Sequence, residues 1–324
     1  GPHATLGCPP PGGSALWDHV VRGDGELPLL ALARGEAPPG GEHEIYLHPD
    51  LAELDFPDRE IFPLGQYYGD SLRSGRWTSM VASRGCDQAC AYCAAHALGG
   101  GLHRTRDPGR VVEELLRLGR DHGVEGVLLE DDNLFTSRSW ALELLEALGQ
   151  ARTGVRLHLP NGVDPMLLDL ELVRHAAQAG VESLALGIES LDPARQAALG
   201  RVIDPAHLAS IIRCCRGHGI RVAGFFIIGL PGDTVPGILA QFRDIRALGL
   251  DLAHVSVYQD LPGLALPAPP ATPARRAALA ALKGLFYPYY YADKERVLRA
   301  LGEEGISRRT VSKAAARFAH WVFR

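Results

Sequence analysis

The sequence is poor in long apolar runs, in cysteine and in excess charge, and each shortage excludes a class of protein. No stretch of the 324 residues approaches the roughly 18 consecutive apolar residues of a membrane span, so we expect a cytoplasmic protein without a membrane partner. Six cysteines are too few for a disulfide scaffold in a chain of this length. A net charge of −5 at pH 7 argues against nucleic acid as an obligatory partner.

Residues 1–40 are rich in proline and glycine and carry one apolar island, LWDHVVRGDGELPLLALARGE, which is too small for a core of its own. Within it, residues 18–23 predict a short strand and residues 26–35 a short helix. Residues 48–76 combine prolines with aromatics, which predicts an extended connector packed on a neighbour. Because the chain begins at Gly1 without a methionine, we also expect it to be a fragment.

From Trp77 onward, short β-rich runs alternate with helical patterns, and most runs follow a glycine that ends a helix. The runs are apolar nearly throughout, which is typical of parallel strands covered on both faces. Six such β/α units predict an α/β fold, a parallel sheet curled into a partial barrel with its functional residues at the C-terminal ends of the strands. The predicted strands lie within residues 77–83, 123–131, 154–162, 180–190, 219–229 and 249–257.

The intervening helices have matching start and stop signals. An aspartate before a proline places an N-cap acid ahead of a first-turn proline, and a glycine after the last turn suits the left-handed C′ position. The predicted start pairs are Asp107-Pro108, Asp164-Pro165 and Asp204-Pro205, and the predicted end residues are Gly123, Gly180 and Gly219.

Three of the six cysteines, Cys86, Cys90 and Cys93, fall within the eight residues CDQACAYC, in the loop after the first predicted strand. Thiolates at spacings of four and three can converge on one iron–sulfur cluster, and a four-iron cluster held by only three thiolates keeps one iron open for a substrate or cosubstrate. His96 leaves a second interpretation, a closed Cys3His zinc site. The other cysteines are interpreted as incidental or core residues, at positions Cys8, Cys214 and Cys215.

The stretch CDQACAYC resembles the Cys-x-x-x-Cys-x-aromatic-Cys signature of the radical S-adenosylmethionine (SAM) enzymes, and the resemblance extends over residues 77–263. It implies a 4Fe-4S cluster whose open iron is chelated by the amino and carboxylate groups of SAM. An electron from the cluster then cleaves SAM to a 5′-deoxyadenosyl radical, which abstracts a hydrogen atom from the substrate. The resemblance also implies an external electron donor of the flavodoxin or ferredoxin type and a small-molecule or peptide substrate that the sequence does not identify.

The same resemblance implies which residues contact SAM. The acids of LLEDDNLF, at the end of the second strand, correspond to the segment that accepts hydrogen bonds from the cofactor's ammonium group, although such acids also cap loops. LGIES corresponds to the strand end that contacts the ribose and methionine parts. GFFIIGLPGDT corresponds to the segment beside the adenine, or equally to a strand followed by a Gly-Pro turn. The implied cofactor contacts are Tyr92, Glu130, Asp131, Glu189, Ser190, Arg201, Ile228 and Gly229.

Residues 1–70 carry a second resemblance, through GPHAT, DHVVRGDGE and ELDFPDREIFPLGQYY, to the tail of a cobalamin-binding domain and its linker in cobalamin-dependent radical SAM enzymes. Those enzymes often transfer methyl groups, so the resemblance implies a methyltransferase-type subclass. The Asp-x-His-x-x-Gly cobalt-ligand motif is absent, and we expect cobalamin only in a full-length form. The alternatives are a radical SAM enzyme that does not use cobalamin and a non-catalytic zinc or iron–sulfur module.

The predicted domain organisation is a cobalamin-binding-like remnant at 1–47, a linker at 48–76, a radical SAM partial barrel at 77–263 and a helical C-terminal extension at 264–324. The extension begins with the linker-like PAPPATPARR and continues with the aromatic LFYPYYYADKERVL. Its tyrosines predict either a helical cap packed over the open edge of the barrel or the lining of a substrate entrance. These tyrosines are Tyr287, Tyr289, Tyr290 and Tyr291.

Overall fold

The computed structural model describes residues 2–7, 18–38, 45–64, 75–261, 264–266 and 272–293. Cys8 and the part of the predicted C-terminal extension beyond residue 293 lie outside these ranges. Within them, no helix combines the length and the apolar character needed to cross a membrane.

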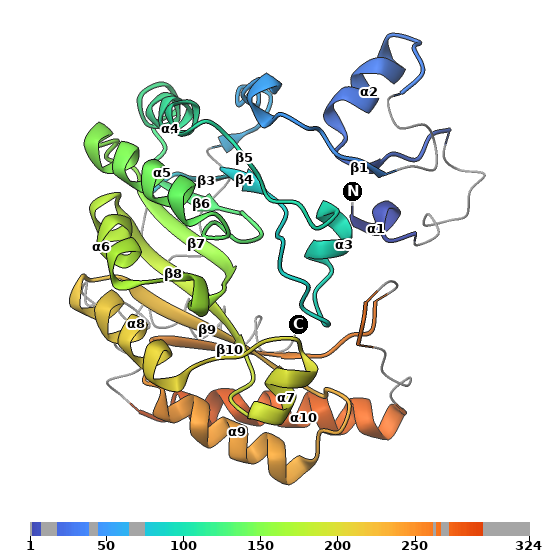
Figure 1. The fold of residues 1–324 in the computed structure, drawn as a ribbon, viewed down its shortest axis with the longest axis vertical. Coiled ribbons are helices and arrows are strands. Elements are labelled where there is room, and N and C mark those ends of the chain that lie inside the picture. Colours follow the sequence, from blue (N-terminus) through green and yellow to red (C-terminus); the bar gives the residue numbers. More distant parts are fainter. Residues whose placement is uncertain are drawn as a thin grey trace.

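A six-stranded parallel sheet forms the centre of the molecule, with the strand order β10-β9-β8-β7-β6-β3 (Figure 1). Each strand pairs with a neighbour through a crossover, so the predicted series of β/α units is confirmed. The observed strands lie inside the predicted runs or overlap them, and the first two are the shortest. Their bounds are β3 (Trp77–Met80), β6 (Gly126–Leu129), β7 (Arg156–Val163), β8 (Val181–Glu189), β9 (Arg221–Ile228) and β10 (Leu252–Val257).

Helices follow the outer side of the curved sheet, as Figure 1 shows. They are α4 (Pro108–His122), α5 (Arg138–Ala151), α6 (Leu170–Gln178), α8 (Pro205–Gly217) and α9 (Val235–Ala247). Burial along β9 alternates, with Val222, Gly224, Phe226 and Ile228 buried toward the helices and the residues between them only half-buried. The inner face of β9 is therefore less fully covered than the outer face, because it lines the concave side of the sheet, which the helices leave open.

The predicted N-cap aspartates and helix-ending glycines are observed at most positions. Asp107 and Asp204 cap α4 and α8, and Gly123, Gly180 and Gly219 all have the left-handed backbone that favours glycine. The pair Asp164-Pro165 differs, because Asp164 caps only a 3-10 turn (Pro165–Leu167), after which Leu168 returns to extended backbone. A second aspartate, Asp169, then caps α6 by accepting from the amide of Leu172.

Helix α10 (Pro273–Tyr290) covers the free edge of β10. The amide of Ala253 donates to the hydroxyl of Tyr291 at 3.3 Å, and a second edge amide, that of Val255, bonds to the hydroxyl of Tyr287. The hydroxyl of Tyr290 donates to the carbonyl of Leu250 at 2.7 Å. Tyrosine hydroxyls thus take the place of a further strand, which agrees with the interpretation of the tyrosines as a packed cap over the barrel edge.

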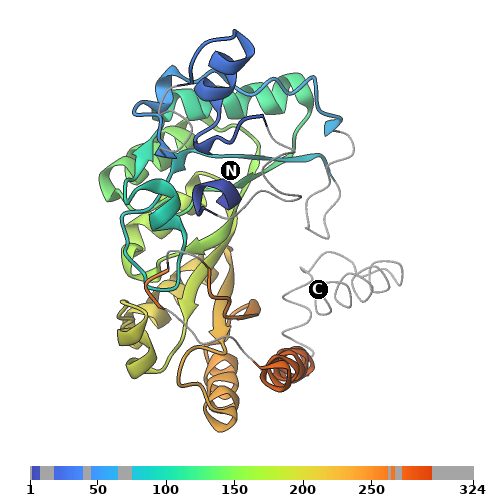
Figure 2. The ribbon, with the colours of Figure 1, turned by 90° about the vertical axis from the view of Figure 1, so that its right-hand side faces the viewer.

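Short N-terminal elements lie at the end of the molecule opposite α10 (Figure 2). They are α1 (Pro2–Thr5), β1 (Arg22–Gly23), α2 (Glu26–Ala33), β2 (Ile45–Tyr46) and a 3-10 turn at Leu51–Glu53, and β1 pairs with β2 in parallel. The predicted short strand and helix are therefore present, although the strand spans only two residues.

The predicted connector packs on α4. The ring of Phe56 lies under the guanidinium groups of Arg110 and Arg117, at 4.4 and 5.0 Å from the ring centroid. Arg59 donates to the buried carboxylate of Glu114 at 3.0 Å. These contacts fasten the N-terminal part of the chain to the first helix of the barrel.

Candidate functional site

The three clustered cysteines lie on a loop that leaves the sheet after β3. This loop, residues 85–103, joins β4 (Ser83–Arg84) to β5 (Arg104–Thr105), and the two short strands pair antiparallel. At its base, Gly85 and Gly99 bring their backbones together, since a Cβ added at Gly99 would lie 2.9 Å from the Cα of Gly85. Gly85 also has φ 82°, which favours glycine. Two glycines therefore close the loop.

Cys86, Cys90 and Cys93 are all free thiols, with Cys86 buried and the other two half-buried. Burial raises the pKa of all three. The pKa of Cys90 rises to about 11 through burial and the nearby Cys93 and Cys86, although the charge of Arg201 acts in the opposite direction. Three thiolates crowded in this way are unfavourable without a cation, and iron would supply that positive charge. The donor set thus suits an iron–sulfur cluster.

The Cys3His zinc interpretation finds no support in the geometry. Across the described ranges, no group of three or more His, Cys, Asp or Glu side chains converges closely enough to hold one metal ion. His96 belongs to α3 (Ala95–Gly99) and is exposed. Ligands of one zinc ion must meet at a single point, whereas a multi-iron cluster takes each thiolate on a different iron atom.

The acidic segment after β6 holds the beginning of the cysteine loop. The carboxylate of Asp131 is buried and accepts hydrogen bonds from the amides of Ala82 and Ser83 and from the Ser83 hydroxyl, the last at 2.7 Å. Asp132 accepts from the amide of Gly85 at 2.8 Å. Burial raises the pKa of Asp131 to about 6, against the hydrogen bonds from Ser83 and Ala82, which lower it. Asp131 therefore has a loop-holding role in this structure, and Glu130 beside it is exposed.

A second polar group connects the cysteine loop to the end of β8. The hydroxyl of Tyr92 donates to Oε1 of Glu189 at 3.1 Å and accepts from Nη1 of Arg201 at 2.9 Å. Nη2 of Arg201 forms an ion pair with Asp164 at 2.8 Å. Asp164 was interpreted from the sequence only as a helix cap, because nothing in Asp-Pro signals a partner far along the chain. The structure thus brings Tyr92, Glu189 and Arg201 together in one hydrogen-bonded group.

Glu189 has an unusual backbone and a buried side chain. Its φ of 63° lies in the left-handed region, which is uncommon for residues other than glycine and clusters at functional sites. A Cβ on Gly187, two residues earlier, would lie 3.1 Å from Oε1 of Glu189, so a larger residue there would crowd the carboxylate and push it aside by a few tenths of an ångström. Burial raises the pKa of Glu189 to about 7, although Arg201 and the Tyr92 hydrogen bond act in the opposite direction.

A pocket of about 470 Å³ opens on the concave side of the sheet beside Glu189. Burial and the charge of Lys283 lower the pKa of His254 to about 4, so its imidazole is neutral at pH 7. Its Nδ1 lies 3.3 Å from the hydroxyl of Tyr287. The lining is apolar apart from three polar side chains and consists of Glu189, Phe225, Phe226, Ile227, His254 and Ser256.

Sequence reasoning missed His254 and Ser256, because LAHVSV was interpreted only as a strand. A signal was present, since two polar residues two positions apart in an apolar strand must share one face. The other three implied cofactor contacts lie at or just after the ends of β8 and β9. Ser190 is fully buried and its hydroxyl accepts from the amide of Asp192, while Ile228 is fully buried toward the helices. The amide of Gly229 donates to Asp233 at 2.7 Å in the Gly-Pro turn.

Comparison with known proteins places these features in a family. The model of the Radical SAM superfamily matches residues 80–244. An uncharacterized methyltransferase of Pyrococcus horikoshii is 24% identical over 290 residues, which cover 82% of this chain and 61% of the relative. The cytidylyl-2-hydroxyethylphosphonate methyltransferase of Streptomyces wedmorensis is 27% identical over 243 residues, covering 70% of this chain and 45% of the relative. The chain thus spans about half the length of these curated relatives.

Among solved structures, the radical SAM methyltransferase TsrM from Kitasatospora setae, with tryptophan substrate and a SAM analog bound, has a similar fold. The TM-score is 0.64 at 20% sequence identity, over 76% of this chain and 52% of that one. A second structure of TsrM, with cobalamin and a 4Fe-4S cluster bound, gives a TM-score of 0.55 at 21% identity, over 59% and 38% of the two chains. At these identities the likeness is one of fold.

The position of Asp131 predicts the effect of removing its carboxylate. Asp131→Ala leaves the amides of Ala82 and Ser83 and the Ser83 hydroxyl without their acceptor, and an unsatisfied buried donor costs about 1 to 3 kcal/mol. We expect the free energy of unfolding, measured by urea denaturation at pH 8, to fall by at least about that amount. The matched control Glu130→Ala, at an exposed neighbour, should stay within about 0.5 kcal/mol of the unsubstituted protein. Unchanged stability in Asp131→Ala would contradict the loop-holding role.

Proposed function

The chain belongs to the radical SAM superfamily, whose members use a 4Fe-4S cluster and SAM, and from this premise we propose that Cys86, Cys90 and Cys93 hold the cluster. One observation carries the proposal: three buried or half-buried free thiols share a loop that two glycines close at the C-terminal edge of a parallel sheet. When bound, the cluster supplies the electron that cleaves SAM.

We further propose that SAM occupies the space between the cysteine loop and the pocket. Glu189 lines that pocket and reaches the loop through Tyr92, so a ligand beside Glu189 is also beside the cysteines. A buried carboxylate suits the two hydroxyl donors of a ribose, and the guanidinium of Arg201 suits the carboxylate of the methionine part. Tyr92 would hold both side chains in place, since it bonds to each.

For the substrate we propose an uncharged, largely apolar group on the His254 side of the pocket. Phe225 and Ile227 supply apolar surface there, while the neutral imidazole of His254 and the hydroxyl of Ser256 supply hydrogen bonds without charge. Both small molecules and peptide side chains can present such a group. The electron donor is proposed to be a separate protein of the flavodoxin or ferredoxin type, and the cytoplasm is the proposed location because a reducing compartment keeps the three thiols free.

The reaction subclass that we propose is cobalamin-dependent methyl transfer by the whole protein. The support comes from relatives described as methyltransferases and from the short parallel pair β1–β2, which is consistent with the edge of an α/β domain. The absence of the Asp-x-His-x-x-Gly motif favours a second candidate, a radical SAM enzyme that works without cobalamin.

The cluster assignment predicts a division among the cysteines. Cys86→Ala, Cys90→Ala and Cys93→Ala should each lose most of the iron that the unsubstituted protein binds on anaerobic reconstitution, because a cluster with three protein ligands cannot spare one. Cys214→Ala is the matched control, since this cysteine lies on α8 away from the loop and should leave iron content unchanged. His96→Ala should also retain iron. Iron loss in Cys214→Ala as complete as in Cys90→Ala would refute the assignment.

The SAM site predicts that Glu189→Gln weakens SAM binding while the iron content stays the same. Replacing a carboxylate that accepts two hydroxyl donors loses a charge-assisted hydrogen bond, which corresponds to about tenfold to a hundredfold in affinity. Calorimetry with SAM on the reconstituted protein measures the change. Glu146→Gln, at an exposed position on the outer helix α5, is the control and should bind SAM normally. An unchanged dissociation constant for Glu189→Gln would remove this residue from the site.

Cobalamin binding can be tested directly on this chain. The parts of residues 1–47 that the structure describes, 2–7, 18–38 and 45–47, supply one two-stranded parallel pair, whereas a corrin and its nucleotide tail need a whole α/β layer around them. We therefore expect the reconstituted chain to hold its iron but to release hydroxocobalamin on desalting, as measured by corrin absorbance. Stoichiometric retention of cobalamin would show that these residues already form the corrin site.

A further inference from the structure

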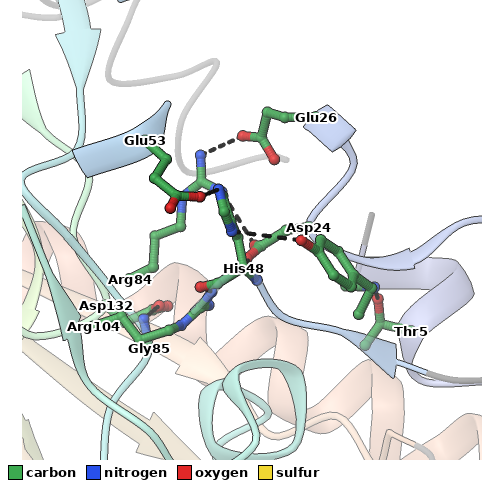
Figure 3. Close-up of polar contacts among 11 residues, drawn as sticks. Thr5, Asp24, Glu26, His48, Glu53, Arg84, Gly85, Arg104 and Asp132 are labelled. Carbon is green, nitrogen blue, oxygen red and sulfur yellow. Dashed lines mark hydrogen bonds and ion pairs between the residues drawn. The ribbon is translucent and has the colours of Figure 1, made fainter. Parts of the chain in front are cut away.

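One N-terminal carboxylate, that of Asp24, contacts an arginine side chain from each of the two strands that carry the cysteine loop (Figure 3). Asp24, which follows β1, forms ion pairs with Nη1 of Arg84 at 3.1 Å and with Nη1 of Arg104. Arg84 ends β4, two residues before Cys86, and Arg104 begins β5 at the far end of the loop. Asp24 thus contacts both ends of the cysteine loop at once, and its neighbour Glu26 pairs with Arg84 from the other side.

Asp24 is itself held in place by the backbone. Its carboxylate accepts from the amide of His48 at 2.9 Å, its own amide donates to the carbonyl of Tyr46 at 2.8 Å, and its side chain is only 12% exposed. Burial alone would raise the pKa of Asp24, but the hydrogen bonds from Arg104 and His48 and the charges of Arg104 and Arg84 lower it overall. The group is therefore a fixed anion between two cations.

The pair of strands β4 and β5 needs support from side chains because few hydrogen bonds join the two strands. Only two residue pairs, Ser83 with Thr105 and Arg84 with Arg104, join β4 to β5. An isolated two-stranded ladder is marginally stable at best, and this one is far shorter than most. On the barrel side, Asp131 and Asp132 hold the strand before the loop. On the other side, Asp24 is the carboxylate that reaches both strands.

We propose that Asp24 is a positioning residue for the 4Fe-4S cluster, which holds the two ends of the cysteine loop together and neutralises the guanidinium groups beside it. The proposal rests on the assignment of Cys86, Cys90 and Cys93 as cluster ligands. This role has two consequences that can be measured separately. Without Asp24 the loop opens more often, so the cluster is lost faster. The arginine charge that Asp24 no longer neutralises also favours the reduced, more negative cluster, so the reduction potential of the cluster becomes more positive.

The experiment uses the whole chain after anaerobic reconstitution of its cluster. In Asp24→Asn we expect a more positive reduction potential in a redox titration followed by electron paramagnetic resonance, and iron release to a chelator about tenfold faster. Asp50→Asn is the matched control, because Asp50 is an exposed N-terminal carboxylate whose side chain caps a short 3-10 turn by accepting from the amide of Ala52. It should change neither quantity. Glu26→Gln, at a more exposed partner of Arg84, should shift both in the same direction by less.

A double variant separates charge from position. Asp24→Asn with Arg104→Gln restores the charge balance without restoring the ion pair, so the potential should return toward that of the unsubstituted protein while iron release stays fast. If Asp24→Asn matches the unsubstituted protein in both measurements, or if Asp50→Asn changes as much, the positioning role is overturned. If the unsubstituted chain itself assembles no cysteine-dependent cluster, the failure lies with the proposed function instead.

Discussion

The candidate site depends on carboxylates that hold a loop almost without secondary structure. The cysteine loop has only a two-residue ladder at its base and one short helix, so hydrogen bonds from side chains must replace those that a longer hairpin would make. Asp131 and Asp132 hold its first strand from the barrel, Glu189 reaches it through Tyr92, and Asp24 joins both of its ends. A carboxylate serves well here because it accepts several donors at once.

The parallel sheet explains why these groups can meet. Strands that run in one direction end at one edge, so the segments after β3, β6 and β8 lie together although they are far apart in the chain. The hydrogen-bonded pairing of the strands is also irregular beside the candidate site. The register of β7 with β8 shifts between Leu159 and Gly162, and that of β8 with β9 between Gly187 and Glu189. The second shift lies at Glu189 itself, where the backbone is left-handed and the side chain reaches Tyr92 of the loop.

The parallel sheet has an open concave side and a covered edge at β10. Helices on the outer side bury alternate residues of β9, while the residues between them line a pocket that ends at Glu189 and His254. At β10, where the sheet stops, Tyr287 of α10 and Tyr291 just after it accept hydrogen bonds from edge amides. The concave side of the barrel therefore stays open to a ligand, whereas the free edge of β10 is covered and cannot pair with a further strand.

Local patterns in the sequence determined the series of strands and helices, the caps at Asp107 and Asp204, and the cluster of cysteines, because each depends on neighbours within a few residues. The sequence also pointed to Tyr92, Glu189 and Arg201 through a family resemblance. What it could not determine was which side chain each acid would meet. Asp24 and Arg104 are 80 positions apart, and Tyr92 and Arg201 are 109 apart. Only the folded sheet decides such pairs, because their geometry is set by crossover connections and burial, and no short-range pattern encodes either.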